Sequence, residues 1–456
     1  MSRVRIDVRE PATSGGSGAF GAKLDAQAPL AARTHASPVA TDTGPTRSWW
    51  AHGLRLVRNA AIAVALMTLV PIGLVAFRGD RLARVVFQGN RSVAIRIAWA
   101  ERTRSFAVPA DPSITPLEAG IALNALQPTR LRMPGFEAIE PGARFIPPWR
   151  MGKLPADMFL TARPNLYGGP SSGSVLEAAA KGFNPREMEY LRALATAPVW
   201  REFDLVAHAR AVDVIGGQFR TPFGAEARPE QRPLPSFKDS KELAYAAVAR
   251  AAYYMAIGQP ETAEMVLRSI VSYGFALIDN GTSEVEELMG AVIVGIGRDA
   301  LRRFYYIRHD LRGSYPALMQ PEAVFDVSTL PARKPMTADE ARRALLVRIE
   351  DPAVPLGARF EGLRSLYATS CTNVPELLLG PRADVQAVLE RARNTVARYP
   401  SEQALLDLQA RMLTPTSDAP SPNPIQSLAV SSATVAGVVL HNPRLASCTR
   451  VLTWGW

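Results

Sequence analysis

The feature that most constrains this chain is an uncharged apolar stretch near its N-terminus. Asn59 to Phe77 contains no charged residue. At about 1.5 Å per residue, a helix of this length crosses a hydrocarbon core about 30 Å thick. Trp49 and Trp50 precede the stretch, where aromatic rings favour the headgroup level. The sequence therefore predicts a single transmembrane anchor over residues 55–78. We expect an uncleaved signal anchor rather than a cleaved signal peptide, because the leader is long and no good cleavage site follows.

Flanking arginines do not decide the orientation of this anchor. Those nearby are Arg47, Arg55 and Arg58 before it, and Arg78, Arg81, Arg84 and Arg91 after it. The positive-inside rule leans slightly toward a cytoplasmic domain. A short cytoplasmic tail with a large translocated domain is nevertheless the usual arrangement for such an anchor. We therefore expect a single-pass protein of the inner (plasma) membrane with its domain on the periplasmic, extracytoplasmic side.

Composition divides the rest of the chain. The N-terminal tail has few large apolar residues and cannot offset the entropy of ordering, so we expect it to be disordered. A proline-rich segment follows the anchor, and its alternation is compatible with a short hairpin of Ser92–Ala98 with Arg104–Val108. The expected divisions are a tail at 1–47, an irregular segment at 85–173, a helical domain at 174–413, a linker at 414–424, and a C-terminal tail at 425–456 that docks on the domain.

Helix start and stop signals are frequent in the larger part of the chain. Thr115 precedes Pro116, Asn184 precedes Pro185, and Ser283 with Glu286 forms a capping box. The expected helices are Pro116–Leu126, Val175–Lys181, Pro185–Thr196, Val199–Val214, Asp239–Ile257, Glu261–Tyr273, Ser283–Ile293 or beyond, Ala341–Glu350, Val354–Ala368, Asp384–Arg398 and Ser401–Met412. The predicted fold class is mainly α, with the transmembrane helix followed by helix pairs and long proline-rich irregular segments.

One helix pair carries a more specific pattern. Ala252, Tyr253 and Tyr254 precede Gly258, and Glu261, Ala263 and a hydrophobic stretch ending at Tyr273 follow it. The segment of about 243–278 resembles one tetratricopeptide-type repeat, a family in which small residues let two helices pack closely. A second copy at the family's period and the expected proline after the second helix are both missing. The resemblance implies an antiparallel helix-pair architecture and a surface that binds proteins.

The chain is basic, with a formal net charge of +10 and a pI of about 9.8. One basic and aromatic cluster stands out, comprising Arg298, Arg302, Arg303, Tyr305, Tyr306, Arg308 and Arg312. It is either a face for an acidic partner or anionic lipid, or a solvated helix face packed by its own aromatics; we favour the second. Nucleic-acid binding is disfavoured because no basic run is interleaved with a stacking platform.

Catalytic motifs are weak. Ser171 lies in a Gly-x-Ser-x-Gly pattern of the nucleophile-elbow type, but no buried strand precedes it, and His208, His309 and His441 stand in no recognisable context. Gly295 and Gly297 imitate a dinucleotide fingerprint inside an expected helix, which leaves no room for the required strand. The sequence therefore predicts no enzyme activity and no cofactor.

Other polar groups have simple explanations. Glu284, Glu286 and Glu287 crowd one helix start, where the cap and the helix dipole account for them. No two histidines are spaced to bind a metal. Cys371 and Cys448 are either a disulfide that ties the tail to the domain or two reduced thiols.

Taken together, these features favour a membrane-anchored helical scaffold that binds other membrane or envelope proteins as an accessory or assembly subunit. Two alternatives stay open. One is an exported serine hydrolase that uses Ser171. The other is a domain that binds lipid or nucleic acid through its basic helix face.

Overall fold

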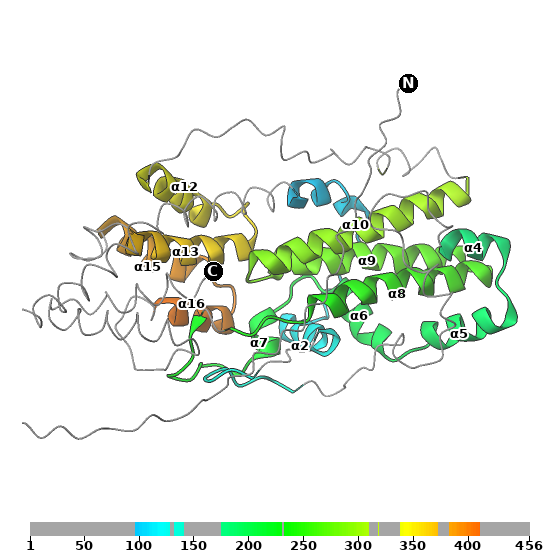
Figure 1. Ribbon diagram of the computed structural model, residues 1–456, viewed down its shortest axis with the longest axis horizontal. Helices are drawn as coiled ribbons and strands as arrows, with labels where there is room; N and C mark the ends of the chain where they lie inside the picture. The colour runs from blue at the N-terminus through cyan, green and yellow to red at the C-terminus, as the bar shows by residue number, and fades with distance from the viewer. Residues whose placement is uncertain are drawn as a thin grey trace, which may run out of the picture. The chain divides into compact units, whose positions relative to one another are not determined.

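The structure is a computed structural model that describes residues 96–127, 132–140, 175–229, 232–309, 318, 338–372 and 383–410. Within these ranges the regular elements are helices, and no strand occurs, which confirms the mainly α prediction (Figure 1). No helix among the described residues has both the length and the apolar character to cross a membrane. The predicted tail at 1–47, anchor at 55–78, linker at 414–424 and C-terminal tail at 425–456 lie outside the described residues.

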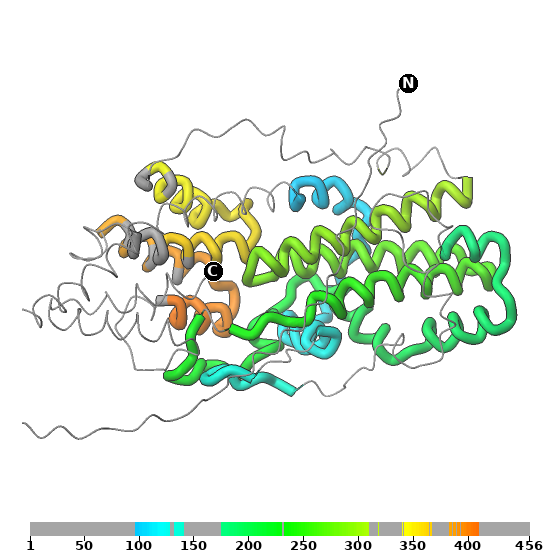
Figure 2. Tube along the Cα trace, in the orientation of Figure 1, coloured from blue at the N-terminus to red at the C-terminus, as the bar shows by residue number. Residues whose placement is uncertain are grey.

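Three consecutive long helices form the centre of the fold. They are α8 (Phe237–Ala256), α9 (Pro260–Asn280) and α10 (Glu284–Ile307). Each packs against the other two, and short turns make neighbours antiparallel (Figures 1 and 2). Every residue of α9 from 269 to 278 is buried, as expected of a helix covered on all sides. Gly258, with a φ of 75°, ends α8 in the left-handed conformation that favours glycine.

Glycines let α9 and α10 approach each other closely. A Cβ added at Gly290 would lie 2.5 Å from the carbonyl oxygen of Gly274, and one at Gly274 would lie 2.8 Å from that of Gly290. A Cβ at Gly297 would similarly meet Val271 at 2.8 Å. The Gly295–Gly297 pattern therefore lies in a helix, as predicted, and Gly297 packs on α9.

Smaller helices complete this first hydrophobic core. They are η1 (Arg104–Phe106), α2 (Pro116–Leu126), α4 (Val175–Lys181), α5 (Pro185–Ala195) and α6 (Val199–His208). Phe203 and Tyr273 are fully buried in it, with ring centroids 5.1 Å apart. The caps predicted for α2 and α5 are present, since Thr115 accepts from Glu118 N and Asn184 from Glu187 N.

A second hydrophobic core gathers the later helices. They are α12 (Ala338–Glu350), α13 (Leu356–Thr372), α15 (Ala383–Thr395) and α16 (Pro400–Ala410), together with the short α7 (Val214–Gln218). Phe136, Phe219 and Phe223 pack there against one another. The adjacent residues Val214 and Ile215 belong to different cores, the first to the α8–α10 core and the second to this one. Helix α7 therefore joins the two.

The predicted helix over Val199–Val214 is wrong from Ala209 to Asp213. Helix α6 ends at His208, and Ala209 is extended. The backbone amides beyond it bond elsewhere: Val212 N donates to Asn280 Oδ1 at 3.1 Å, and Asp213 N to Pro116 O at 2.8 Å. These distant acceptors take the amides that a continuous helix would have used.

The predicted hairpin is also wrong in its described part. Residues 96–101 are helical, and Arg104–Phe106 is a 3-10 turn. Helix α9 uses the backbone groups that a partner strand would have needed. Arg268 donates to the carbonyls of Phe106 and Ala107, and Val108 N donates to Ser272 Oγ at 2.7 Å.

Candidate functional site

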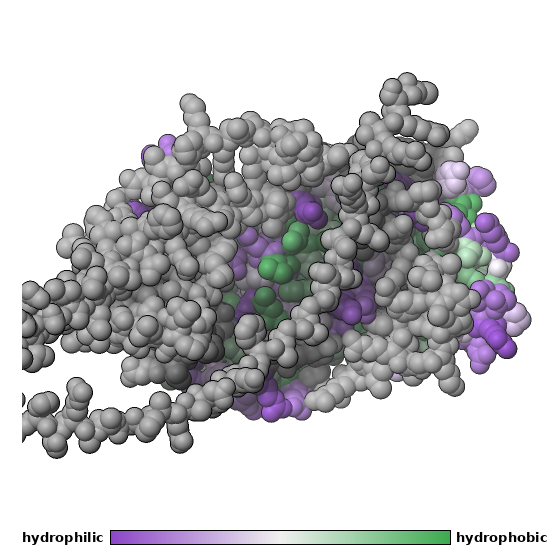
Figure 3. Space-filling model, viewed as in Figure 1, coloured by the Kyte–Doolittle hydropathy of each residue, from purple (hydrophilic) through white to green (hydrophobic). Residues whose placement is uncertain are grey.

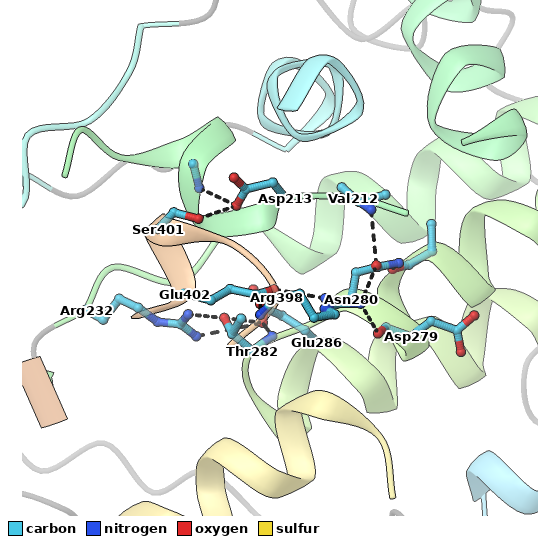
Figure 4. Close-up of polar contacts among 12 residues, drawn as sticks. Val212, Asp213, Arg232, Asp279, Asn280, Thr282, Glu286, Arg398, Ser401 and Glu402 are labelled. Carbon is cyan, nitrogen blue, oxygen red and sulfur yellow. Dashed lines mark hydrogen bonds and ion pairs between the residues drawn. The ribbon is translucent and has the colours of Figure 1, made fainter. Parts of the chain in front are cut away.

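A buried polar cluster lies where the two hydrophobic cores meet, around the turn between α9 and α10 (Figure 4). It draws side chains from the segments before α7 and α8, from α9, α10 and α12, and from α16 with the residues before it. We refer to it as the polar junction, comprising Asp213, Arg232, Asn280, Thr282, Glu284, Glu286, Glu287, Arg348, Arg398, Ser401 and Glu402.

Asn280, the last residue of α9, connects three parts of the chain. Its amide nitrogen donates to Ala276 O within α9, and its Oδ1 accepts from Val212 N. The same oxygen accepts from Arg398 Nη1 at 3.1 Å (Figure 4). The side chain is buried, so these bonds replace water and fix both neighbouring segments against α9.

The start of α16 is fixed in the same way. Glu402 is fully buried and accepts from Arg398 N at 2.7 Å and Arg398 Nη2 at 2.9 Å. Ser401 Oγ donates to Asp213 Oδ1 at 2.6 Å, and that oxygen also accepts from Gly216 N (Figure 4). Asp213 therefore caps α7 and holds α16 at once.

The predicted capping box at the N-terminus of α10 forms in part: Ser283 Oγ accepts from Glu286 N at 3.3 Å, but the Glu286 side chain bonds to the backbone amide of Thr282 in place of that of Ser283. Glu286 Oε2 accepts from Thr282 N at 2.6 Å and from Ser283 Oγ at 3.1 Å. Arg232 lies beside them, donating to Thr282 Oγ1 and lying 3.7 Å from Glu286 Oε2. Glu286 Oε1 has no hydrogen-bond partner among the described residues.

Glu287 lies in α10, but its side chain caps a different helix, α13. Its Oε1 accepts from Ala358 N, in the first turn of α13, at 2.8 Å. A Cβ at Gly357 would lie 2.7 Å from this oxygen and 2.7 Å from Ser283 O, so the N-termini of α10 and α13 nearly touch. Close by, Arg348 of α12 donates to Glu284 at 2.5 Å. Glu287 thus acts as the cap of a helix that begins far along the chain.

Burial changes the chemistry of Glu287. Its side chain is fully buried, and loss of hydration raises its pKa to about 8. The amide of Ala358 and the charge of Arg348 oppose this rise, whereas Glu284 and Glu286 add to it. Carboxylates outnumber arginines in the polar junction, so a neutral Glu287 reduces the repulsion there. The arrangement can bind a proton near neutral pH. The described residues include no group of His, Cys, Asp and Glu placed to hold a metal.

The predicted basic and aromatic cluster is divided by the structure. Arg298 and Tyr305 are buried: Arg298 stacks on Trp99 at 4.4 Å and donates to Leu318 O, and Tyr305 donates to Glu264 at 2.8 Å. Arg302 and Arg308 pair at 3.7 Å with Asp299 and Glu261 respectively. Arg303 is half-buried, Tyr306 is exposed, and Arg312 lies outside the described residues.

The other predicted site residues are the candidate nucleophile, the candidate bases and the two cysteines. Ser171, His441 and Cys448 lie outside the described residues, and Cys371 lies in α13. Of the candidate bases, His208 ends α6 with Nδ1 3.2 Å from Pro109 O, and His309 follows α10 with a φ of 57°.

Three exposed large side chains occur near one end of the three long helices, at the α8–α9 turn, in the first turns of α9 and at the end of α10. Ile257 is 40% exposed, Met265 44% and Tyr306 62%. The contacts of Tyr305 with Glu264 and of Arg308 with Glu261 place the end of α10 beside the start of α9. We call Ile257, Met265 and Tyr306 the turn-end patch. Figure 3 shows apolar and polar surface side by side at the right-hand end of the view, where α4, α5 and this end of the long helices lie in Figure 1.

Sequence reasoning missed the burial of Glu286 and Glu287. It explained both by the helix start, which accounts for Glu286 but not for Glu287. A signal was available, because Glu287 is in helical register with the buried residues Ala291, Val294 and Leu301. A carboxylate on the apolar face of a helix points to a partner from another element.

Comparison with known proteins gives no family assignment. No family model matches the chain, and neither a curated protein nor a solved structure matches it at a significant level.

Proposed function

We propose that this chain is a membrane-anchored helical scaffold that binds other membrane or envelope proteins, as an accessory or assembly subunit. The observation that carries the proposal is the turn-end patch. Three large apolar side chains stand exposed at the end of three long, mutually packed helices. Exposed apolar and aromatic side chains on a rigid support are typical of protein-binding surfaces.

The helix pair adds support for this role. Ala252 and Ala263 are fully buried on either side of the α8–α9 turn, as in helix-pair repeats of the tetratricopeptide type. Such pairs bind peptides and subunits through exposed helix surfaces. An anchor at 55–78 would raise the local concentration of this surface near membrane partners.

The test is co-purification from native membranes in mild detergent, followed by mass spectrometry. We expect a stoichiometric partner with the unchanged chain, and at least a tenfold lower yield of it with the triple variant Ile257→Thr, Met265→Gln, Tyr306→Gln. A matched control, Leu117→Gln, Ile121→Gln, Val347→Thr, alters exposed apolar side chains on α2 and α12 and should retain the partner. A chain that elutes alone, or equal loss with both variants, would overturn the proposal.

The anchor is tested separately. The full chain should stay in the membrane pellet after a high-salt wash, and a chain lacking residues 1–78 should leave it. Retention of the shortened chain would show that another segment or a partner holds the protein at the membrane.

A further inference from the structure

The contact between α10 and α13 depends on a group that is costly to ionise. Glu287 is fully buried, and Gly357 brings the N-terminus of α13 against Glu287 Oε1 and Ser283 O. The second oxygen, Oε2, has no hydrogen-bond partner among the described residues. Protonation removes the charge of a buried carboxylate with one unbonded oxygen, whereas the ionised form needs water or a cation to offset that charge.

The surrounding charges do not meet that demand. On α10, Glu284 and Glu286 are like charges beside Glu287, and both raise its pKa. On α12, Arg348 is the opposite charge, but it is bonded to Glu284 at 2.5 Å. From α13, Glu287 receives one backbone amide, that of Ala358. The carboxylate form therefore gains one hydrogen bond and a shared arginine in exchange for its hydration.

We propose that Glu287 is a proton-sensitive latch that holds α13, together with the α12 packed against it, on the N-terminus of α10. While Glu287 carries a proton, α13 stays docked. When the carboxyl ionises, opening of the α10–α13 contact admits water to the charge. This proposal is independent of the scaffold function, although opening would expose a second surface of the same molecule.

The direction of the pH effect follows from the pKa values. The pKa of Glu287 is about 8 in the docked state, and its ordinary value of 4.5 applies when the carboxyl is hydrated. The stabilisation of the docked state is complete below the lower value. It is lost as pH rises through the window between the two, and it levels off above 8. Over this window the opening equilibrium constant rises up to tenfold per pH unit, which gives roughly 50-fold between pH 6 and 8.

Hydrogen–deuterium exchange of the full chain in detergent measures this opening. Exchange of the α13 amides is compared at equal pH between the unchanged chain and Glu287→Gln, so the intrinsic pH dependence of exchange cancels. We expect α13 exchange in the unchanged chain to rise relative to the variant by at least tenfold from pH 6 to 8, and to level off by pH 9. The control Glu189→Gln, at an exposed position of α5, should behave like the unchanged chain.

The latch would be overturned if the ratio of α13 exchange between the unchanged chain and Glu287→Gln stayed constant with pH. If Glu287→Gln loses its helical circular dichroism, the unchanged chain still decides the matter. In that case the ratio of α13 to α8 exchange within one molecule must rise over the same pH range. A constant ratio would contradict the proposal.

Discussion

Single arginines in this protein have very different surroundings. Arg398 is 37% exposed and bonds to Glu402 and Asn280, both of which are buried. Arg391 bonds to Glu350 at 2.8 Å, but both side chains are about half exposed. Removing a partner from a buried carboxylate leaves an uncompensated charge, whereas an exposed ion pair contributes little.

We therefore expect Arg398→Met to lower the free energy of unfolding by roughly 1–3 kcal/mol, since part of the arginine is screened by solvent. Arg391→Met should change it by less than about 1 kcal/mol. Urea unfolding followed by circular dichroism measures both. Equal losses would mean that the polar junction adds no stability beyond that of a surface ion pair.

At the residue scale, the helix caps show which contacts can be predicted from the sequence and which cannot. Thr115, Asn184 and Ser283 were recognised as caps because their partners lie three residues away. Glu287 was not recognised as a cap, because its partner Ala358 lies 71 residues away. Local chemistry can be read from the chain, but a cap supplied by another element cannot.

At the scale of elements, helices were predicted wherever the local signal was sufficient. Helix α2 begins and ends at the predicted residues, and α10 begins one residue after its predicted cap. Helix α9 runs beyond the predicted Tyr273 to Asn280, because Gly274 does not end the helix but lets α10 approach it closely. Helix α6 is shorter than predicted because the amides that follow it bond to distant parts of the fold.

Glycines within α10 give a paired prediction. A Cβ at Gly290 would lie 2.5 Å from Gly274 O and 2.9 Å from Ile278 N, which are backbone atoms of α9. Gly290→Ala should therefore force the two helices apart and destabilise the protein by about 1–3 kcal/mol. A Cβ at Gly295 would meet only the ring of Trp99, at 3.6 Å. Gly295→Ala should be neutral or stabilise by up to about 1 kcal/mol, through helix propensity.

Thermal unfolding of the two glycine variants in parallel measures this difference. Because both changes add one methyl group to the same helix, a shared effect on propensity cancels between them. If Gly290→Ala were as stable as Gly295→Ala, the close approach of α9 and α10 would be contradicted.

At the scale of the whole molecule, two hydrophobic cores meet through a polar junction. The contacts that join them link residues far apart in sequence, such as Asp213 with Ser401 and Val212 with Asn280. Apolar periodicity indicates which face of each helix is buried, but not which helix covers it. The two cores and their junction therefore could not be predicted from the sequence, although the helices themselves could.

The two cores should differ in local stability. Helix α9 is covered by α8, α10, α6, η1 and α13, whereas α15 packs mainly against α12 and α16. Local opening is easier where fewer buried contacts are lost. In native-state hydrogen exchange at pH 7, amides of α9 should be the slowest and those of α15 at least tenfold faster. Equal protection would indicate that both cores open together as one cooperative unit.

Because Val214 and Ile215 pack into different hydrophobic cores, the length of α7 is constrained. Helix α7 has only five residues, and neighbouring side chains on a helix point about 100° apart. One inserted or deleted codon before Ile215 would turn every later side chain of α7 by that angle and send it toward the wrong core. A change in the length of this helix would misalign both cores at once. Recombination that exchanges one half of the protein must therefore keep the spacing of α7 intact.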